Sequence, residues 1–310
     1  MLEDYRRALF AVAIAGLAAM LMLPLLLGFH VELASFLPLY VLAALPAIVL
    51  PYAAWRGLHA LRPALEATSL GLLVTLPVLV LSYAAMRLAM PLADPLLVRM
   101  DVAIGFDWTQ FTRWVDRSWT ASFILGLGYS SFSFQLLLLP SLLCIARLPA
   151  RAYQLVLAYF ILCAVSAGIA IFFPSVGAYV THNMDPASLD NVSGRFGHFF
   201  LDSFHAVRDE TAFSLGIDNV AGILTFPSVH AGVAALCAWA AWPSRGLRYP
   251  FLALNLIMAV SAITHGAHYL IDVIAGGLVA AATVPLVHRL AAALRPKAES
   301  QAAGPIPLPG

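Results

Sequence analysis

Eight long apolar runs constrain the fold of this chain more than any other feature. A helix that crosses the hydrocarbon core of a bilayer needs about 20 mostly apolar residues, and the backbone polar groups in that core must be satisfied internally. The runs therefore predict an all-α, polytopic membrane protein with about eight transmembrane helices. They cover residues 8–28, 33–54, 68–90, 121–146, 152–174, 225–242, 250–267 and 269–292.

The composition agrees with a membrane location and excludes several classes of protein. The 310 residues are 62% hydrophobic and 11% charged, whereas soluble domains carry about 25% charged residues. A formal net charge of +1 offers no basic surface, so no nucleic-acid partner is expected. The three cysteines, Cys144, Cys163 and Cys237, lie in apolar runs without paired spacing, which indicates buried thiols rather than disulfides or a metal cage.

The distribution of arginine predicts that both termini face the cytoplasm. Arginine and lysine are enriched in cytoplasmic loops, and short loops obey this rule best. The short loops at residues 143–153 and 242–250 both contain arginine pairs. Two long segments, 91–120 and 174–225, then lie outside. Their aromatic residues are typical of an extracytoplasmic cap at the level of the lipid headgroups.

The sequence divides into three parts on this topology. Residues 1–67 hold the first two apolar runs and predict accessory transmembrane helices. Residues 68–293 hold the other six runs together with the two outer segments. Residues 294–310 are rich in proline and glycine and predict a disordered cytoplasmic tail.

Two histidine motifs end on the same outer face of the membrane. The motif FPSVH (226–230) stands at the start of the sixth run, and HGAHYLID (265–272) stands at the start of the eighth. One hairpin of helices separates them, so the topology brings both helix starts to one surface. The two motifs are therefore expected to form one site.

The residue types in these motifs predict phosphoryl transfer through a phosphohistidine. His268 and Asp272 are four residues apart, so a helix places them on one face. The carboxylate would hold Nδ1–H of the imidazole, fix its tautomer and leave Nε2 as the nucleophile. His230 would give a proton to a leaving oxygen, and Ser228 with the free N–H groups of its helix would hold an anion.

Two alternatives remain open at this stage. The three histidines and one aspartate of the two motifs have a spacing that zinc accepts, although a metal site has no need of Pro227 and Ser228 before His230. A transporter or a non-catalytic membrane protein would use the same side chains to relay protons or bind a ligand. Transporters often show repeated halves, and this sequence shows no repeat.

The combination Phe-Pro-Ser-x-His and His-Tyr-x-x-Asp resembles the type 2 phosphatidic acid phosphatase superfamily over roughly residues 94–285. The segments DVAIGFDW (101–108) and YSSFSFQ (129–135) are similar to the branch that contains fungal inositol phosphorylceramide synthases and their bacterial relatives. The resemblance implies a six-helix phosphatase-type core, to which the first two helices are an addition.

The resemblance also implies a role for each site residue. His268 would be the nucleophile, Asp272 its orienting partner and His230 the general acid, while Ser228 would contact the phosphoryl oxygens. No metal or other cofactor is implied. The partners would be a membrane lipid substrate and, in a transferase, a lipid or polyol acceptor.

The sequence departs from the superfamily where arginine is expected. The usual motif Ser-Arg-x5-His is matched here by Ser261 and Ala262, and the usual motif Lys-x6-Arg-Pro is absent from the outer segments. Because the charge of the transition state needs a cation, arginines of the outer segments are the predicted substitutes, and His265 is predicted to share this role or to bind a headgroup. The candidates are Arg195 and Arg208, with Arg99 and Arg113 behind them.

The sequence as a whole predicts a lipid phosphatase or phosphotransferase at the extracytoplasmic leaflet. The acceptor is water in the first case and a hydroxyl group in the second, and the resemblance tilts slightly toward transfer. Phosphatidic acid, isoprenyl diphosphates, lipid A phosphates and phosphatidylinositol all remain open as donors. Lysine occurs only at Lys297, and this arginine-dominated composition predicts a bacterial inner membrane with the site facing the periplasm.

Overall fold

The computed structural model describes residues 2–58 and 61–295, and its long helices correspond to the eight apolar runs of the sequence. This correspondence confirms the prediction of an all-α, polytopic membrane protein. The helices are α1 (Leu2–Leu27), α2 (Leu37–Trp55), α3 (Leu61–Arg87), α6 (Trp119–Ile145), α7 (Pro149–Ala170), α10 (Val229–Ala241), α11 (Arg248–His265) and α12 (Leu270–Ala293).

Six helices of the described chain are long and apolar enough to cross a membrane. They are α1, α3, α6, α7, α12 and the stretch Leu33–Trp55, in which the short 3-10 helix η1 (Leu33–Phe36) leads into α2. The other two predicted spans differ: α10 has 13 residues and α11 has 18. α10 starts later than predicted because Ser228 ends the preceding turn and caps the helix, its hydroxyl accepting a hydrogen bond from the Ala231 N–H.

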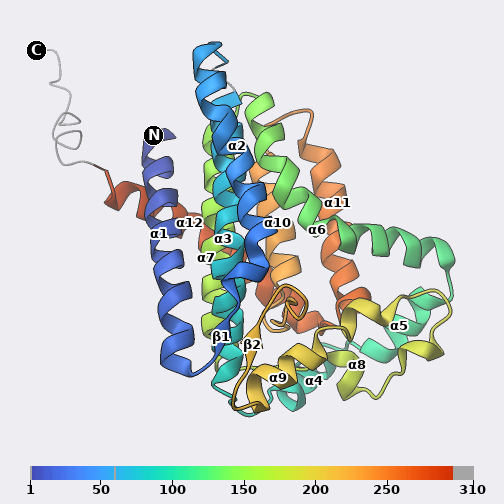
Figure 1. Ribbon diagram of the computed structural model, residues 1–310. Coiled ribbons are helices and arrows are strands. Elements are labelled where there is room, and N and C mark those ends of the chain that lie inside the picture. Colours follow the sequence, from blue (N-terminus) through green and yellow to red (C-terminus); the bar gives the residue numbers. More distant parts are fainter. Residues whose placement is uncertain (1, 59–60, 296–310) are drawn as a thin grey trace, which may run out of the picture.

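Most of the remaining elements gather at one end of the helix bundle, at the bottom of Figure 1. We call these elements the outer cap. They are α4 (Asp94–Ala103), α5 (Trp108–Asp116), α8 (Ala178–Thr181), η2 (Pro186–Ser188), η3 (Gly194–Gly197), α9 (Leu201–Asp209) and the strand β2 (Ser214–Leu215). β2 pairs in parallel with β1 (His30–Val31), which joins the connection between α1 and α2 to the cap.

The ends of α1 and α12 meet at the opposite end of the bundle. The hydroxyl of Tyr5 lies 2.6 Å from Nδ1 of His288, and Arg295 donates to Asp4 at 2.9 Å. α1 packs against α3, α7 and α12, and α2 packs against α3, so the boundary predicted after residue 67 falls within α3. Apart from residues 294 and 295, the predicted tail 294–310 lies outside the described residues.

The close crossing of α10 and α12 depends on two glycines. A Cβ on Gly276 would collide with the carbonyl oxygen of Ser228, and a Cβ on Gly232 would lie 3.2 Å from the carbonyl oxygen of Gly276. Well-packed interiors have no free space for such additions. At this crossing the Ser228 N–H donates to the carbonyl oxygen of Asp272 at 3.0 Å, so the two histidine motifs are joined through their backbones.

Candidate active site

His268 lies between α11 and α12 and pairs with Asp272 in the first turn of α12. Nδ1 of His268 is 3.3 Å from Oδ2 of Asp272, and the two residues are only 3% and 0% exposed. The same Oδ2 accepts a hydrogen bond from the Tyr269 N–H at 3.0 Å, as part of a capping box. Oδ1 has no hydrogen-bond partner in the described part of the chain. The start of α12 therefore holds the carboxylate where it orients the imidazole.

His230 extends from the first turn of α10 into the same space. Its ring stacks on Tyr129 with centroids 4.2 Å apart and lies 6.2 Å from the ring of His268. A phosphoryl group spans such a gap, because an attacking atom stands ~3–3.5 Å from the phosphorus and a general acid ~2.6–3.2 Å from its oxygen. Among the described residues, Nε2 of His268 and both nitrogens of His230 have no hydrogen-bond partner.

Both histidines line a cavity of about 500 Å³, which we call the histidine cavity. Its walls come from α3, α6, α7 and α10, from η3 and the chain that follows it, and from residues 222–225. Of the residues that the structure describes, no arginine or lysine lines it. Most of its lining is apolar, with seven aromatic residues: Tyr129, Phe132, Phe134, Tyr159, Phe196, Phe199 and Phe200.

Ser228 and His265 lie beside this cavity rather than in its lining. Ser228 is fully buried, and its hydroxyl accepts the Ala231 N–H at 3.3 Å. His265 is 2% exposed, its Nδ1 lies 3.0 Å from Oγ1 of Thr264, and its Nε2 faces Gly126 of α6. Within residues 2–58 and 61–295, no group of three or more histidine, cysteine, aspartate or glutamate residues is arranged to hold a metal ion.

The predicted arginines also lie outside the lining of the histidine cavity. Arg195 is exposed in η3, directly before Phe196, which does line the cavity. Arg208 donates to the carbonyl oxygen of Met90 at 2.9 Å, within the outer cap. The structure therefore brings together His230, His268 and Asp272, and not these cations. Two further candidates are exposed on α4 and α5: Arg99 and Arg113.

The outer cap holds the loop that carries His268. Nε1 of Trp108 donates to the carbonyl oxygen of His268 at 3.1 Å, and the Ala178 N–H donates to the carbonyl oxygen of Ala267 at 2.8 Å. Ala267 has a φ of 59°, in the left-handed region that alanine rarely adopts. These contacts stabilise an unusual backbone conformation beside His268.

Asp101 of α4 anchors the start of α12 from the same side. Its two carboxylate oxygens accept hydrogen bonds from the Ile271 N–H at 2.9 Å and the Leu270 N–H at 3.0 Å. Burial raises the pKa of Asp101, and these two bonds oppose the rise. A carboxylate at a helix N-terminus is favourable. The sequence marks Asp101 only as a member of an outer segment and by the resemblance of residues 101–108, because a helix cap that comes from a distant segment leaves no local signal.

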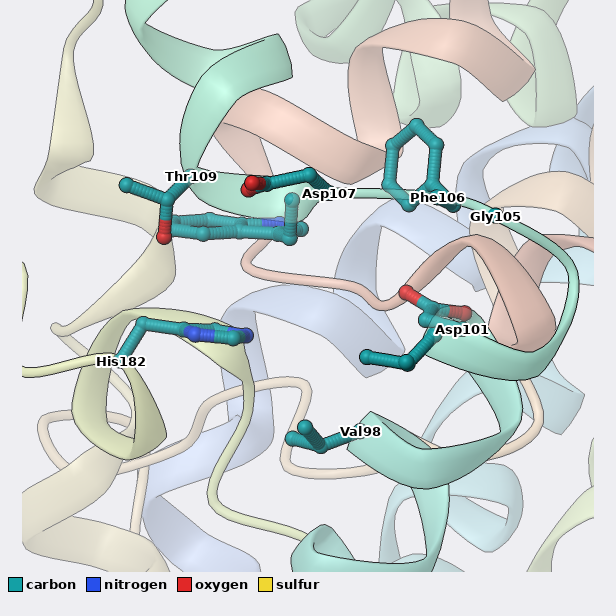
Figure 2. Close-up of a pocket in the computed structure, with 9 residues that line it drawn as sticks. Val98, Asp101, Gly105, Phe106, Asp107, Thr109 and His182 are labelled. Carbon is teal, nitrogen blue, oxygen red and sulfur yellow. The ribbon is translucent and has the colours of Figure 1, made fainter.

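Asp101 also borders a second cavity, of about 480 Å³, between α4, α5 and α8. Figure 2 shows His182 facing Asp101 across it. The His182 ring stacks on Trp108 with centroids 5.3 Å apart, and burial lowers the pKa of His182 although Asp107 and Asp101 oppose this shift. Both carboxylates already cap helices, Asp101 at α12 and Asp107 at α5 through the Gln110 N–H at 2.9 Å. Their positions are thus explained by helix capping.

Comparison with known proteins agrees with this geometry. A family model described as the PAP2 superfamily matches residues 95–286, which is more than half of the 310 residues. No curated protein and no solved structure gives a significant match. The matched residues run from α4 to α12 and include the outer cap and both histidine motifs. With its paired histidines and their aspartate inside that match, the chain belongs to the PAP2 superfamily.

Proposed function

We propose that this protein is an integral-membrane lipid phosphoesterase or phosphotransferase that works through a phosphohistidine on His268. The observation that carries the proposal is the His268–Asp272 pair, with the ring of His268 6.2 Å from that of His230 at the wall of an apolar cavity. Membership of the PAP2 superfamily supports a phosphatase-type enzyme. Long apolar helices around the site support a membrane lipid as the substrate.

In the first step, Nε2 of His268 attacks the phosphorus of the lipid. The bond from phosphorus to the leaving oxygen breaks, and protonated His230 gives its proton to that oxygen. Asp272 keeps the proton of His268 on Nδ1 and stabilises the positive charge that develops on the ring. The products of this step are a phosphohistidine and a free hydroxyl on the departing group.

In the second step, an acceptor oxygen attacks the phosphohistidine. His230, now neutral, takes the proton of the acceptor as the N–P bond breaks, which restores both histidines. Water as the acceptor gives a phosphatase, and the hydroxyl of a lipid or polyol gives a transferase. Because one site serves both half-reactions, the proposal predicts ping-pong kinetics.

The charge of the histidine cavity favours a phosphodiester as the donor. A phosphomonoester carries about −1.5 to −2 charge at neutral pH, whereas a phosphodiester carries one negative charge. The described lining supplies histidines, hydroxyl groups and the N-terminus of α10, but no arginine or lysine. A helix N-terminus stabilises an anion without a formal cation. This supports transfer of a phospho-headgroup, as in the inositol phosphorylceramide synthase-like branch.

We further propose that the reaction takes place at the extracytoplasmic leaflet of a bacterial inner membrane, facing the periplasm. The arginine content of the short loops supports this orientation, with the ends of α1 and α12 in the cytoplasm. Cysteines placed at positions in the outer cap should react with an impermeant thiol reagent added from outside to intact cells. Labelling only after the cytoplasm is opened would contradict the orientation.

The decisive experiment compares the purified protein with His268→Ala. Phosphatidic acid, phosphatidylinositol and isoprenyl diphosphate would be supplied with and without ceramide and diacylglycerol as acceptors. Free phosphate, or a free phosphorylated headgroup from phosphatidylinositol, released by the wild type alone identifies hydrolysis, and a new phospholipid without either product identifies a transferase. Rapid quenching with substrate labelled at phosphorus should leave label on the wild type and none on His268→Ala. Equal turnover by the two proteins would refute the proposal.

A further inference from the structure

A second apolar space adjoins the histidine cavity, deeper in the bundle. This space measures about 180 Å³ and is lined by residues of α2, α3, α6 and α7, which run side by side in Figure 1. We call the two spaces together the α3 channel, because residues of α3 line both. They have four wall residues in common: Thr75, Phe132, Ser133 and Tyr159.

The walls of the α3 channel are mostly apolar, and two α3 residues that line it have hydroxyls that are already paired. The hydroxyl of Thr75 donates to the carbonyl oxygen of Gly71 at 3.0 Å, and that of Ser82 donates to the carbonyl oxygen of Leu79 at 2.6 Å. Each hydroxyl is therefore satisfied within its own helix. Among the described residues no aspartate, glutamate, lysine or arginine lines either space.

The length of the α3 channel fits a hydrocarbon chain. Ser82 lines the histidine cavity and Thr68 lines the deeper space. These two residues of α3 are 14 positions apart, which corresponds to about 21 Å along the helix. The hydrocarbon core of a bilayer is about 30 Å thick, so one leaflet occupies about half of that. At the inner end, the hydroxyls of Thr68 and Ser141 lie 3.3 Å apart and join α3 to α6.

We propose that the α3 channel binds one long hydrocarbon chain of the substrate lipid, while its phosphate lies between His268 and His230. The position of the phosphate rests on the proposed function, and the occupancy of the channel rests on the shared walls and their chemistry. The chain enters beside the histidines and extends along α3 toward Gly71. The residues of the deeper space, at the inner end of the channel, then determine which chain lengths the protein accepts.

A single substitution tests this arrangement. A Cβ on Gly71 would lie 3.6 Å from Cγ2 of Val156, which is ordinary contact, so Gly71→Leu is tolerated by the backbone and its side chain fills the deeper space. Gly168→Leu on α7 is the matched control, because a Cβ there meets nothing within 4 Å and Gly168 lines neither space. Neither residue belongs to the catalytic machinery.

The substrates are alkyl phosphates and alkyl phosphoinositols of increasing chain length, used below their micelle concentrations with protein held in amphipol. In the wild type and in Gly168→Leu, kcat/KM should rise about fourfold for each CH₂ that enters the channel and then level off. In Gly71→Leu it should level off at a shorter chain. If kcat/KM depends on chain length in the same way in all three proteins, the proposal is overturned. The channel would then hold at most a structural lipid.

A second measurement separates this proposal from the proposed function. An alkyl phosphate with a diazirine at the end of its chain is crosslinked to His268→Ala, which requires no turnover. Label on α3 between Thr68 and Thr75, lost when Gly71→Leu is added, supports the α3 channel whether or not the wild type is active. Label confined to the lipid-facing surfaces of α1 and α2 refutes it. Absence of all turnover in the wild type would refute the proposed function alone.

Discussion

Replacing Asp272 with asparagine tests how the carboxylate acts on His268. Oδ2 of Asp272 accepts two hydrogen bonds, from Nδ1 of His268 at 3.3 Å and from the Tyr269 N–H at 3.0 Å. In Asp272→Asn, only the amide oxygen can take this position, because the amide nitrogen would place its hydrogens against the Tyr269 N–H. The structure therefore predicts that the variant keeps the Nδ1–H tautomer of His268.

The expected loss of activity follows from this orientation. A hydrogen bond to a charged group contributes ~1.5–3 kcal/mol and a neutral one ~0.5–1.5 kcal/mol. The substitution should therefore remove about 1.4 kcal/mol of the stabilisation of the charged imidazole in the transition state, which lowers kcat about tenfold. In a triad where the same substitution gives the wrong tautomer, the loss is about 10⁴.

Activity and stability are measured on the same preparations. The assay compares kcat and kcat/KM of wild type, Asp272→Asn and His268→Ala, and thermal unfolding checks that the variants remain folded. A loss near tenfold in a folded variant supports the orientation argued from the Tyr269 N–H. Full activity in Asp272→Asn would refute the role of Asp272, and a loss as large as that of His268→Ala would refute the predicted amide orientation.

Two further predictions concern the outer cap. Asp101→Asn leaves one N–H at the start of α12 without its acceptor, which costs ~1–3 kcal/mol of folding stability. Because this turn positions His268 and Asp272, kcat should also fall about tenfold, which corresponds to ~1.4 kcal/mol of the activation barrier, with KM nearly unchanged; a raised KM with normal kcat would contradict a positioning role. For Asp116, burial favours a higher pKa, but the N–H groups of residues 190–192 outweigh it and lower the pKa below 3.8. Its contribution to stability is therefore full above pH 3.8 and is lost as pH falls through the folded-state pKa. The protection factors against hydrogen exchange at residues 190–192, which correct for the pH dependence of the intrinsic rate, should fall on acidification through that range, and unchanged protection factors would count against the assignment.

Much of the fold could be predicted from the sequence because the membrane imposes one simple rule on it. Apolar length alone located all eight long helices. His268 and Asp272 are in contact, but His268 precedes the N-cap Tyr269, so the contact is made across the capping turn and not along one face of a helix as predicted. The start of α10 was placed too early, since residues 225–228 (TFPS) form a turn before the helix begins. Apolar composition does not reveal where a helix is capped.

The predictions that depended on long-range contacts were less complete. The sequence marks Trp108 and Asp101 only as members of an outer segment, whereas the structure bonds them to His268 and to the first residues of α12. The roles expected of Arg195 and Arg208 stay predictions, although neither lines the histidine cavity. A missing arginine motif indicates that a cation is absent from its usual place, but it does not indicate which group replaces it.

The position of the family match separates the proposed chemistry from the proposed recognition of the lipid chain. The match covers residues 95–286, which include both histidines, Asp272 and the cap residues that hold their loop. The α3 residues of the channel, from Thr68 to Ser82, precede this match, as does Leu39 of α2. Members of the superfamily can therefore share the phosphoryl-transfer residues while differing in the helices that line the channel. The other walls of the channel, on α6 and α7, lie inside the match. On this argument, substitutions in α2 and α3 should change the chain preference of this protein without changing the reaction.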